Sequence, residues 1–339
     1  MAETETLTLD TIAALSRAVL EAAGASPAQA APLAAAIARA EADGIPSHGL
    51  MYLPVYAEHL GCGKVAGQAV TVLDRPRPGV VRVDAATGFA HAAIAAGRPL
   101  LIEVARDNGI ACLAVRNSYN CGVLGHHAEA LAEAGLAALC FTNAPASIAP
   151  VGGLTPVVGT NPVALALPDG AGGARLVIDQ SASVVAKSEV VKRAKAGTAI
   201  PEGWALDAAG RPTTDPAEGL KGTMVPAGGP KGVGAGLIVE SFAALLAGAT
   251  LGIDAAPFSG TAGGPPRTGQ FLIAVDPGAT AGPGFGAALD RLAAAVEAQE
   301  GARLPGARRH ANRARAAAEG VPVDAATLAR IRALPGGTG

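Results

Sequence analysis

The sequence is poor in aromatic residues and in charge, and each shortage argues against a class of partner. Aromatic residues make up 3% of the 339 residues, too few for the stacking surfaces that bind nucleic-acid bases. Charged residues make up 16% and the formal net charge is −2, so no basic excess attracts nucleic acid or an anionic membrane. Because 50% of the residues are hydrophobic, we expect a globular protein with a large core and neither kind of partner.

Cysteines and long apolar runs are also scarce. The four cysteines contain no C-x-x-C pair, which predicts reduced thiols and no metal site. No apolar run reaches the roughly 18 residues of a membrane helix. The first residues, MAETETLTLD, lack the basic and apolar regions of a secretory signal. We therefore expect a cytoplasmic location.

Apolar spacing predicts helices at both ends of the chain and alternating strands and helices between them. Residues 8–42 carry apolar side chains at helical spacing. Residues 233–252 are almost purely apolar and small, and we expect them to form a long buried helix. This order of elements indicates an α/β protein, and the chain length favours two domains.

A Rossmann dinucleotide-binding fold is not indicated. Its G-x-G-x-x-G turn follows a strand and opens a helix. The nearest candidate, residues 61–66, reads GCGKVA and follows a predicted helix instead. Periodicity alone therefore leaves the cofactor open.

Seven short motifs in a fixed order carry a resemblance to a known family. They read DGIPSHGL, VRNSYNCGVLGHHAEALAEAGL, TNAPASIAPVGG, PVVGTNPVALALP, DQSASVVAKSEV, IPEGWALDAAGRPTTDP and GGPKGVG. With them the chain resembles, over residues 8–330, the malate/L-lactate dehydrogenase-like, non-Rossmann family of NAD(P)-dependent oxidoreductases. That family includes ureidoglycolate and sulfolactate dehydrogenases and Δ1-piperideine-2-carboxylate reductases.

The resemblance implies a fold, an assembly and a reaction. It implies a mixed α/β fold with a largely antiparallel-sheet cofactor domain at residues 76–279. A helical domain would be built from residues 1–75 and 280–339. A homodimer is implied too, with NAD or NADP as cofactor. The reaction would be the reversible reduction of a small 2-oxo acid or cyclic 2-imino acid.

His48 matches the family's proton donor, and its chemistry suits that role. Histidine has an unperturbed pKa of about 6.5, near working pH, so it can supply a proton as hydride arrives. Glu189 lies at the position of the family's relay acid, usually an aspartate, and Ser47 matches the relay hydroxyl. Taken alone, Glu189 is equally a solvated carboxylate at a helix start, and Ser47 equally a helix cap.

The remaining matched positions concern the cofactor and the substrate. Thr160 matches a substrate-contacting threonine, although a plain turn would look the same. The arginines of the late basic stretch could pair with phosphates, or form a solvated basic patch. The family's cofactor contacts map onto Asn120, Cys121, Gly122, Val123, Leu124, Asp179, Gln180, Ser181, Lys187, Ser188, Pro230, Lys231, Arg303, Arg308 and Arg309.

Two positions depart from the family pattern. Tyr52 stands where the family commonly has an arginine that binds the substrate carboxylate, and a phenol offers one neutral hydrogen bond instead of a charged pair. Asn120 stands where many members have a second histidine. Asparagine cannot transfer a proton at neutral pH but can orient a carbonyl or the nicotinamide carboxamide. The acid/base work therefore falls to His48.

These departures leave two other readings. One is a non-catalytic NAD(P)-binding relative with a degenerate site. The other is a serine hydrolase using Ser47, His48 and Glu189, but no G-x-S-x-G elbow accompanies them. His126 and His127 are adjacent on a predicted helix and face different directions, so we expect packing or helix-start roles for them and no shared metal.

Overall fold

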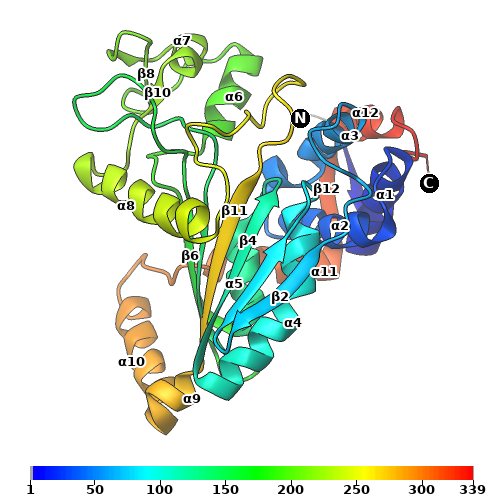
Figure 1. Ribbon diagram of the computed structural model, residues 1–339. Coiled ribbons are helices and arrows are strands. Elements are labelled where there is room, and N and C mark those ends of the chain that lie inside the picture. The colour runs from blue at the N-terminus through cyan, green and yellow to red at the C-terminus, as the bar shows by residue number, and fades with distance from the viewer. Residues whose placement is uncertain (1–2, 339) are drawn as a thin grey trace.

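The two ends of the chain meet in one helical region. The computed structural model describes residues 3–338, and Figure 1 shows both termini on the same side of it. The strands of the two ends pair antiparallel, with Thr4 opposite Asp324. Their shared core includes Leu20, Ile37 and Ile331, all fully buried. The region consists of β1 (Thr4–Leu7), α1 (Leu9–Ala22), α2 (Pro27–Ala42), α3 (Leu53–Gly61), α11 (Ala307–Glu319), β12 (Val321–Asp324) and α12 (Ala325–Arg332).

A seven-stranded sheet forms the centre of the described chain. Across the sheet the order is β2 (Val72–Arg77), β3 (Val80–Asp84), β4 (Ile110–Ser118), β11 (Thr268–Val275), β5 (Ala137–Thr142), β6 (Val163–Pro168) and β7 (Ala174–Gln180). Within residues 3–338, β3 and β4 are its one parallel pair, and every other neighbouring pair is antiparallel. The predicted antiparallel, non-Rossmann sheet is thus confirmed, since a Rossmann sheet is mostly parallel.

Helices cover both faces of this sheet. Two of them, α4 (Ala90–Asn108) and α5 (Leu124–Ala132), pack on one face, where Leu113 and Leu272 are fully buried. On the other face, Phe141 and Phe242 stack with ring centroids 4.6 Å apart. Phe242 lies in η3 (Ser241–Leu246), a π-helical turn that continues α8 (Pro230–Glu240). The strand side chains alternate between these two cores, as a strand's period of two requires.

The prediction for residues 233–252 was wrong in two respects. The regular helix begins earlier, at Pro230, and the helical backbone ends at Leu246. Its large apolar side chains are not all buried: in the single chain, Leu237 is 49% exposed and Leu245 is 63% exposed. The apolar run therefore covers the sheet with one side and leaves a second apolar side uncovered.

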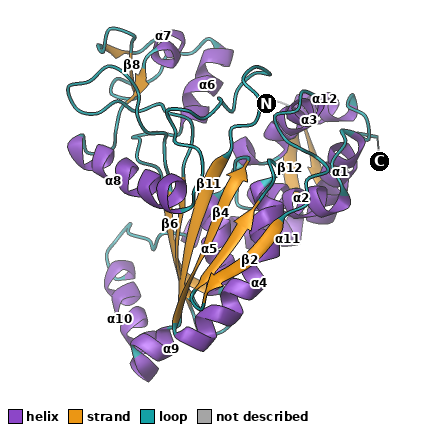
Figure 2. Ribbon diagram, in the orientation of Figure 1, coloured by secondary structure: helices purple, strands orange, loops and turns teal. Residues whose placement is uncertain are grey.

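Smaller elements complete the chain. Residues 187–224, which are rich in loops, form a small lobe whose core includes Ile200 and Met224 (Figure 2). Near the sheet edge, Ala293 of α10 packs with Leu176 of β7. The boundaries at residues 76 and 280 stay a prediction. These elements are α6 (Lys187–Ala196), β8 (Ala205–Leu206), β9 (Pro212–Thr213), α7 (Pro216–Lys221), β10 (Thr223–Met224), α9 (Pro277–Thr280), η4 (Gly282–Gly284) and α10 (Phe285–Glu297). Among the described helices, none combines the length and apolar character that crossing a membrane requires.

Candidate active site

A rigid turn presents His48. Two short 3-10 turns, η1 (Pro46–His48) and η2 (Leu50–Tyr52), connect α2 to α3. The buried carboxylate of Glu41 accepts a 2.6 Å hydrogen bond from the backbone N–H of Leu50. A Cβ at Gly49 would collide with that carboxylate, so only glycine fits between the two turns. The hydrogen bond from Leu50 to Glu41 thus fixes the backbone beside His48.

The imidazole of His48 is held by its Nδ1 atom. Ser47 Oγ lies 3.2 Å from His48 Nδ1. This leaves Nε2 as the ring nitrogen available to a substrate. Ser47 and His48 therefore stand together as predicted, whereas the catalytic role of each stays a prediction.

Burial and nearby charges set the protonation of His48. Burial lowers the pKa of His48 below its usual value, and the positive charges of His126 and Arg309 lower it further. The negative charge of Asp179 acts in the opposite direction and raises it. The imidazole is consequently mostly neutral at pH 7 and is a strong proton donor once protonated.

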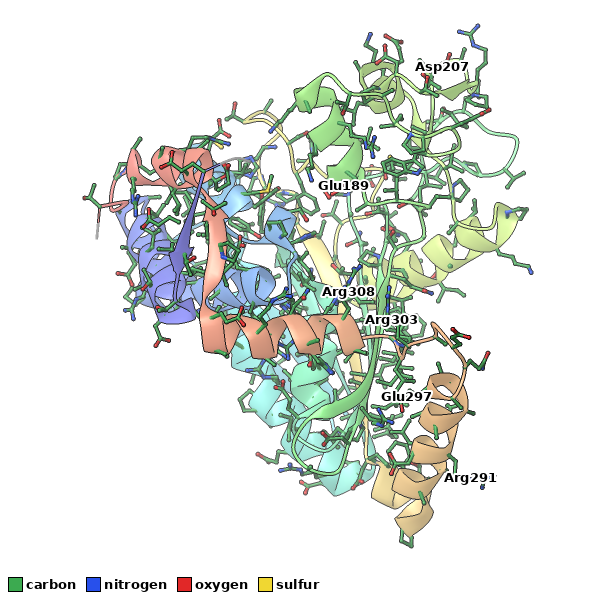
Figure 3. The ribbon with its side chains drawn as sticks, turned by 180° about the vertical axis from the view of Figure 1, so that it is seen from behind. Glu189, Asp207, Arg291, Glu297, Arg303 and Arg308 are labelled. Atoms are coloured by element: carbon green, nitrogen blue, oxygen red, sulfur yellow. The ribbon has the colours of Figure 1, made fainter. Side chains whose placement is uncertain are left out.

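The predicted relay acid belongs to a different element of the chain. Glu189 is in the first turn of α6, and Figure 3 labels it there, on a different element from His48. Among the described residues, neither a hydrogen bond nor an ion pair joins Glu189 to His48. The carboxylate whose charge acts on His48 here belongs to Asp179, which the sequence predicted as a cofactor contact. The relay role of Glu189 stays a prediction.

Asp179, at the end of β7, is gripped by two donors. Arg309 Nη1 lies 3.0 Å from Asp179 Oδ2. The backbone N–H of Gly125, in the first turn of α5, donates to the same oxygen at 3.1 Å. A Cβ at Gly125 would approach both partners to 2.9 Å, so glycine allows this close packing. The positive end of the α5 dipole thus meets a carboxylate.

The loop that precedes α5 contains the predicted dinucleotide contacts Asn120 to Leu124. Gly122 adopts a left-handed conformation with φ of 65°, and a Cβ there would lie 2.8 Å from His91 Nε2. Cys121 and Leu124 are buried, whereas Asn120 is partly exposed. Because glycine has no side chain, a nucleotide can approach the backbone of this loop closely.

The other predicted cofactor residues lie at element ends. Strand β7 ends at Gln180, and Ser181 follows it directly. Helix α6 begins with Lys187 and Ser188, and helix α8 begins with Pro230 and Lys231.

Two of the predicted arginines remain available for phosphates. Arg303 precedes α11 and Arg308 lies in its first turn; both are exposed, and Figure 3 labels both near the start of that helix. Within residues 3–338 no ion pair occupies either guanidinium. Two free guanidinium groups and the glycine loop suit the phosphates and the backbone approach of a dinucleotide.

Thr160, the predicted substrate-contacting threonine, lies in the loop between β5 and β6. The carbonyl of Thr160 accepts a 2.8 Å hydrogen bond from the N–H of Ala182, so Thr160 lies beside the strand end that carries Asp179. No cluster of metal-ligating side chains occurs among the described residues.

All three tyrosines of the chain meet next to this turn. Tyr52 and Tyr56 pack edge to face with ring centroids 4.7 Å apart, and Tyr119 contacts Tyr56 in the same way. The hydroxyl of Tyr52 donates to the backbone carbonyl of Phe258 at 3.3 Å. Its one hydrogen is therefore used within the protein, and Tyr52 presents its ring where the family pattern has a cation.

A loop that no sequence motif singled out closes over this aromatic cluster. The ammonium group of Lys64 donates to the carbonyl of Pro257 at 2.6 Å. His59 contacts the hydroxyl of Tyr119 through Nδ1 and the carbonyl of Gly260 through Nε2. The sequence suggested no partners for His59, because its partners lie 60 and 201 residues away in the chain.

A buried ionic network lies behind the site and joins three helices. Arg313 of α11 pairs with Asp43 at 2.8 Å and with Glu129 of α5 at 2.9 Å. His126 Nε2, in the first turn of α5, lies 3.0 Å from Asp43 Oδ2, so this histidine belongs to the network. His310 also pairs with Glu129, at 2.8 Å, although the sequence assigned it no partner.

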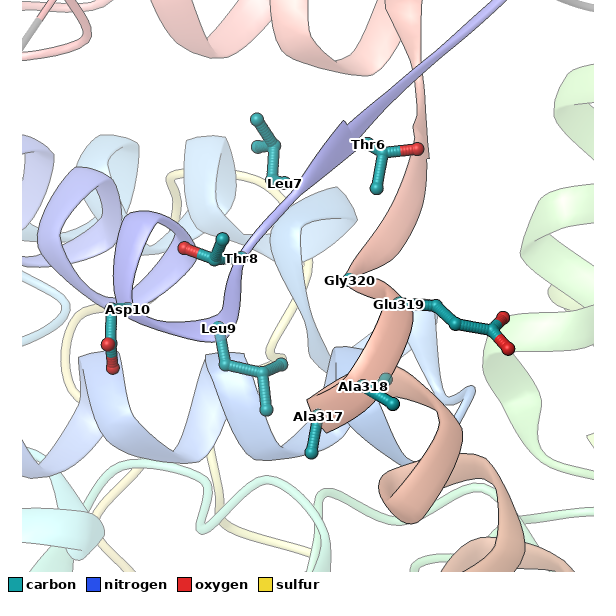
Figure 4. Close-up of a pocket in the computed structure, with 10 residues that line it drawn as sticks. Thr6, Leu7, Thr8, Leu9, Asp10, Ala317, Ala318, Glu319 and Gly320 are labelled. Atoms are coloured by element: carbon teal, nitrogen blue, oxygen red, sulfur yellow. The ribbon is translucent and has the colours of Figure 1, made fainter.

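A hollow of about 520 Å³ lies elsewhere, between the start of α1 and the end of α11. In Figure 4 the side chains of Asp10 and Glu319 point away from each other at this hollow. It contains none of the predicted site residues. The hollow is therefore separate from the candidate active site at the turn of His48.

The fold and the site define a class of protein: a dinucleotide-dependent oxidoreductase that does not use a Rossmann sheet. A family model described as malate/L-lactate dehydrogenase matches residues 7–332. The chain belongs to this family and is an NAD(P)-dependent dehydrogenase or reductase.

Two curated relatives and one solved structure support the assignment. The chain is 43% identical to the "(2R)-3-sulfolactate dehydrogenase (NADP(+))" of Chromohalobacter salexigens, over 94% of this chain and 95% of that protein. It is 40% identical to the "Delta(1)-pyrroline-2-carboxylate reductase" of Ancylobacter novellus, over 98% of each. The Δ1-piperideine-2-carboxylate reductase from Pseudomonas syringae pv. tomato has the same fold, with a TM-score of 0.92, 38% identity, and coverage of 98% of this chain and 100% of that one.

Proposed function

We propose that the chain reduces a small cyclic 2-imino acid or a 2-oxo acid, with His48 as the proton donor. The observation that carries this proposal is the geometry of His48, whose Nδ1 is held by Ser47 Oγ at 3.2 Å while Nε2 is left for the substrate. Relatives that cover nearly the whole chain are named as reductases and dehydrogenases, which supports a working rather than a degenerate site.

Each residue of the turn has a task in this reaction. The bound nicotinamide supplies the hydride. His48 carries a proton on Nε2 and releases it to the substrate nitrogen or oxygen, and Ser47 keeps the ring in that orientation. The charge of Asp179 favours the imidazolium before transfer. Glu189, by its family position, serves as the relay acid, and Tyr52 and Thr160 contact the substrate.

Of the two substrate types, the surroundings of Tyr52 favour the cyclic imino acid. A cyclic imino acid has one carboxylate, whose charge is balanced once His48 has protonated the ring nitrogen, whereas a dicarboxylate or a sulfonated 2-oxo acid carries two negative charges. A desolvated anion needs a paired cation. Here an aromatic ring replaces the family's cation, and the neighbouring Tyr56 ring lies 4.7 Å away. A small cyclic substrate of low net charge therefore suits the Tyr52 and Tyr56 rings better than a substrate with two negative charges.

For the cofactor, we propose that the loop at Cys121 to Leu124 and the strand end at Asp179 to Ser181 bind the dinucleotide. Arg303, Arg308, Lys187 and Lys231 are positively charged groups suited to its phosphates. NADP is the form named for the sulfolactate relative. Titration with both nucleotides decides between NAD and NADP.

We further propose a cytoplasmic homodimer. Its support is an uncovered apolar surface on α8, η3 and the loop that follows them, which we call the α8 surface. It consists of Leu237, Ile238, Leu245, Leu246 and Ile253, each at least 49% exposed. Leu237, Leu245 and Ile253 also line one hollow of about 280 Å³. Contiguous apolar surface of this kind is typical of a protein interface.

The test is a cofactor titration followed by a substrate panel. Δ1-pyrroline-2-carboxylate and Δ1-piperideine-2-carboxylate should oxidise the bound reduced cofactor, and the 2-oxo analogue of 3-sulfolactate should be turned over more slowly. His48→Ala should lower turnover by about 100-fold or more while cofactor affinity stays nearly unchanged. Cofactor binding without turnover of any candidate would contradict the proposal.

A further inference from the structure

We infer that Asn120 is the neutral donor that holds an oxygen of the substrate carboxylate, and that Tyr56 is the residue that positions it. This inference rests on the proposed function and concerns the same site. It assigns a role to Tyr56, which carries no motif in the sequence. It also narrows Asn120 from a general cofactor contact to a determinant of substrate binding.

The side-chain amide of Asn120 has a defined orientation. The backbone N–H of Gly122 lies 3.2 Å from Asn120 Oδ1. Because an N–H group only donates, the atom that faces it must be the amide oxygen. The hydroxyl of Tyr56 donates to the same oxygen at 3.3 Å. With both donors on Oδ1, the amide nitrogen points away from them, and within residues 3–338 no protein acceptor bonds to it.

Both donors are themselves immobile. Tyr56 is 1% exposed, and its ring packs edge to face against Tyr52, Phe89 and Tyr119. Burial raises the pKa of Tyr56 well above its ordinary value, so the phenol always keeps its hydrogen. Gly122 is confined by His91, which would lie 2.8 Å from a Cβ at that position. Asn120 is therefore preorganised as a donor, which reduces the entropy lost on binding.

The placement of Asn120 points to the substrate carboxylate. His48, Tyr52 and Tyr56 follow one another at intervals of four residues, and Tyr52 and Tyr56 are in ring contact. The hydroxyl of Tyr52 is committed to the carbonyl of Phe258, so it is not a donor to a ligand. Tyr56 fixes Asn120 and also packs against Tyr52, the residue that replaces the family's arginine. The amide nitrogen of Asn120 is therefore a neutral donor next to these rings. An amide suits the single carboxylate of a cyclic imino acid.

The central variant is Asn120→Asp. Aspartate has nearly the same shape and keeps an oxygen for Gly122, but it replaces the amide donor with a second acceptor and adds a negative charge. We expect the KM for Δ1-pyrroline-2-carboxylate, or for whichever panel compound is turned over fastest, to rise by about 30-fold or more. The Kd for the reduced cofactor, measured by fluorescence titration, should change by less than about 2-fold.

Tyr56→Phe is the matched test of positioning, because it removes one oxygen and keeps the ring. We expect kcat/KM to fall by about 5-fold through KM, with the pH dependence of kcat unchanged because His48 is intact. In an Asn120→Ala background, Tyr56→Phe should have no further effect on KM. Thermal unfolding of each variant reports separately on loss of structure.

Other outcomes would overturn the inference. If Asn120→Asp weakens cofactor binding and leaves KM unchanged, the amide serves the nicotinamide carboxamide. If the effects of Tyr56→Phe and Asn120→Ala on KM are additive, Tyr56 does not act through Asn120. If the unaltered protein binds cofactor but turns over no compound of the panel, the proposed function itself fails. Equilibrium dialysis with proline as a non-reacting carboxylate probe then tests Asn120 alone, and equal binding to the Asn120→Asp variant would contradict its role.

Discussion

Asp179 and Arg309 form an ion pair of 3.0 Å, and the charges of both act on His48 in opposite directions. Asp179 belongs to the central sheet, and Arg309 belongs to helix α11, in the C-terminal part of the chain. The protonation of the proposed acid therefore depends on contact between segments from distant parts of the chain. A cofactor phosphate that drew Arg309 toward itself would leave His48 more basic.

Arg309→Gln should shift the pH dependence of turnover. Arg309 lowers the pKa of His48, so its removal leaves the opposing effect of Asp179 and raises that pKa. Reduction needs protonated His48, and its rate falls as pH rises through this pKa. The fall should therefore occur at higher pH in the variant, measured as kcat at saturating cofactor between pH 5 and 9. Arg308→Gln, next to it on α11, should leave the midpoint in place. A midpoint that moves to lower pH in Arg309→Gln would rule out this electrostatic account.

Glu189→Gln tests the proposed relay acid. Glutamine keeps the size of the side chain and removes its charge. If Glu189 orients or polarises His48 during turnover, kcat should fall by about 10-fold, with little change in cofactor affinity. Glu202→Gln, at an exposed position of the same small lobe, is the control and should behave as the unaltered enzyme. Equal kcat for the two variants would leave Asp179 as the acidic group that acts on His48.

The buried network around Arg313 should make stability depend on pH. Asp43 and Glu129 are buried, which by itself would raise their pKa values, but their partners outweigh this and depress the pKa of each to about 2. Carboxylates with depressed pKa values stabilise the fold above their ordinary pKa, and this contribution is lost as pH falls. Arg313→Met should lower the free energy of unfolding by about 2 kcal/mol at pH 7.

Urea unfolding at several pH values measures this contribution. The difference between Arg313→Met and the unaltered protein should shrink as pH falls from about 5 toward 2, where both carboxylates become protonated. Arg17→Met removes an exposed ion pair with Glu21 on α1 and should change stability little at any pH. A difference for Arg313→Met that is constant with pH would show that lost packing, not charge, causes the effect.

Leu245→Arg should convert the proposed dimer into monomers. Leu245 is 63% exposed and belongs to the α8 surface, and a buried, unpaired arginine in an apolar interface is unfavourable. Sedimentation velocity on the unaltered protein and the variant measures the mass of each. Val70→Arg, at a position 79% exposed outside the α8 surface, is the control. A dimeric Leu245→Arg variant would place the interface on another surface.

Much of the architecture follows from local patterns. Apolar side chains at helical spacing predicted helices within residues 8–42, and α1 and α2 lie in that stretch. Gly109, directly after α4, adopts the left-handed conformation that ends many helices. Residues 233–252 were misjudged, because a purely apolar segment carries no polar face to show which side stays uncovered. Burial of such a segment depends on what packs against it.

The same distinction between local patterns and packing applies to the candidate site. By itself, the sequence determined the order of the motifs, and through them the family, the non-Rossmann sheet and the choice of His48 as the candidate proton donor. Only the tertiary structure decided which charges and hydroxyls surround that histidine. Asp179, whose charge acts on His48, is 131 residues away from it in the sequence. Arg313 pairs with Asp43 across 270 residues, and Tyr56 contacts Asn120 across 64 residues. Such contacts form when separate elements pack together, and no local spacing encodes which distant side chains will meet.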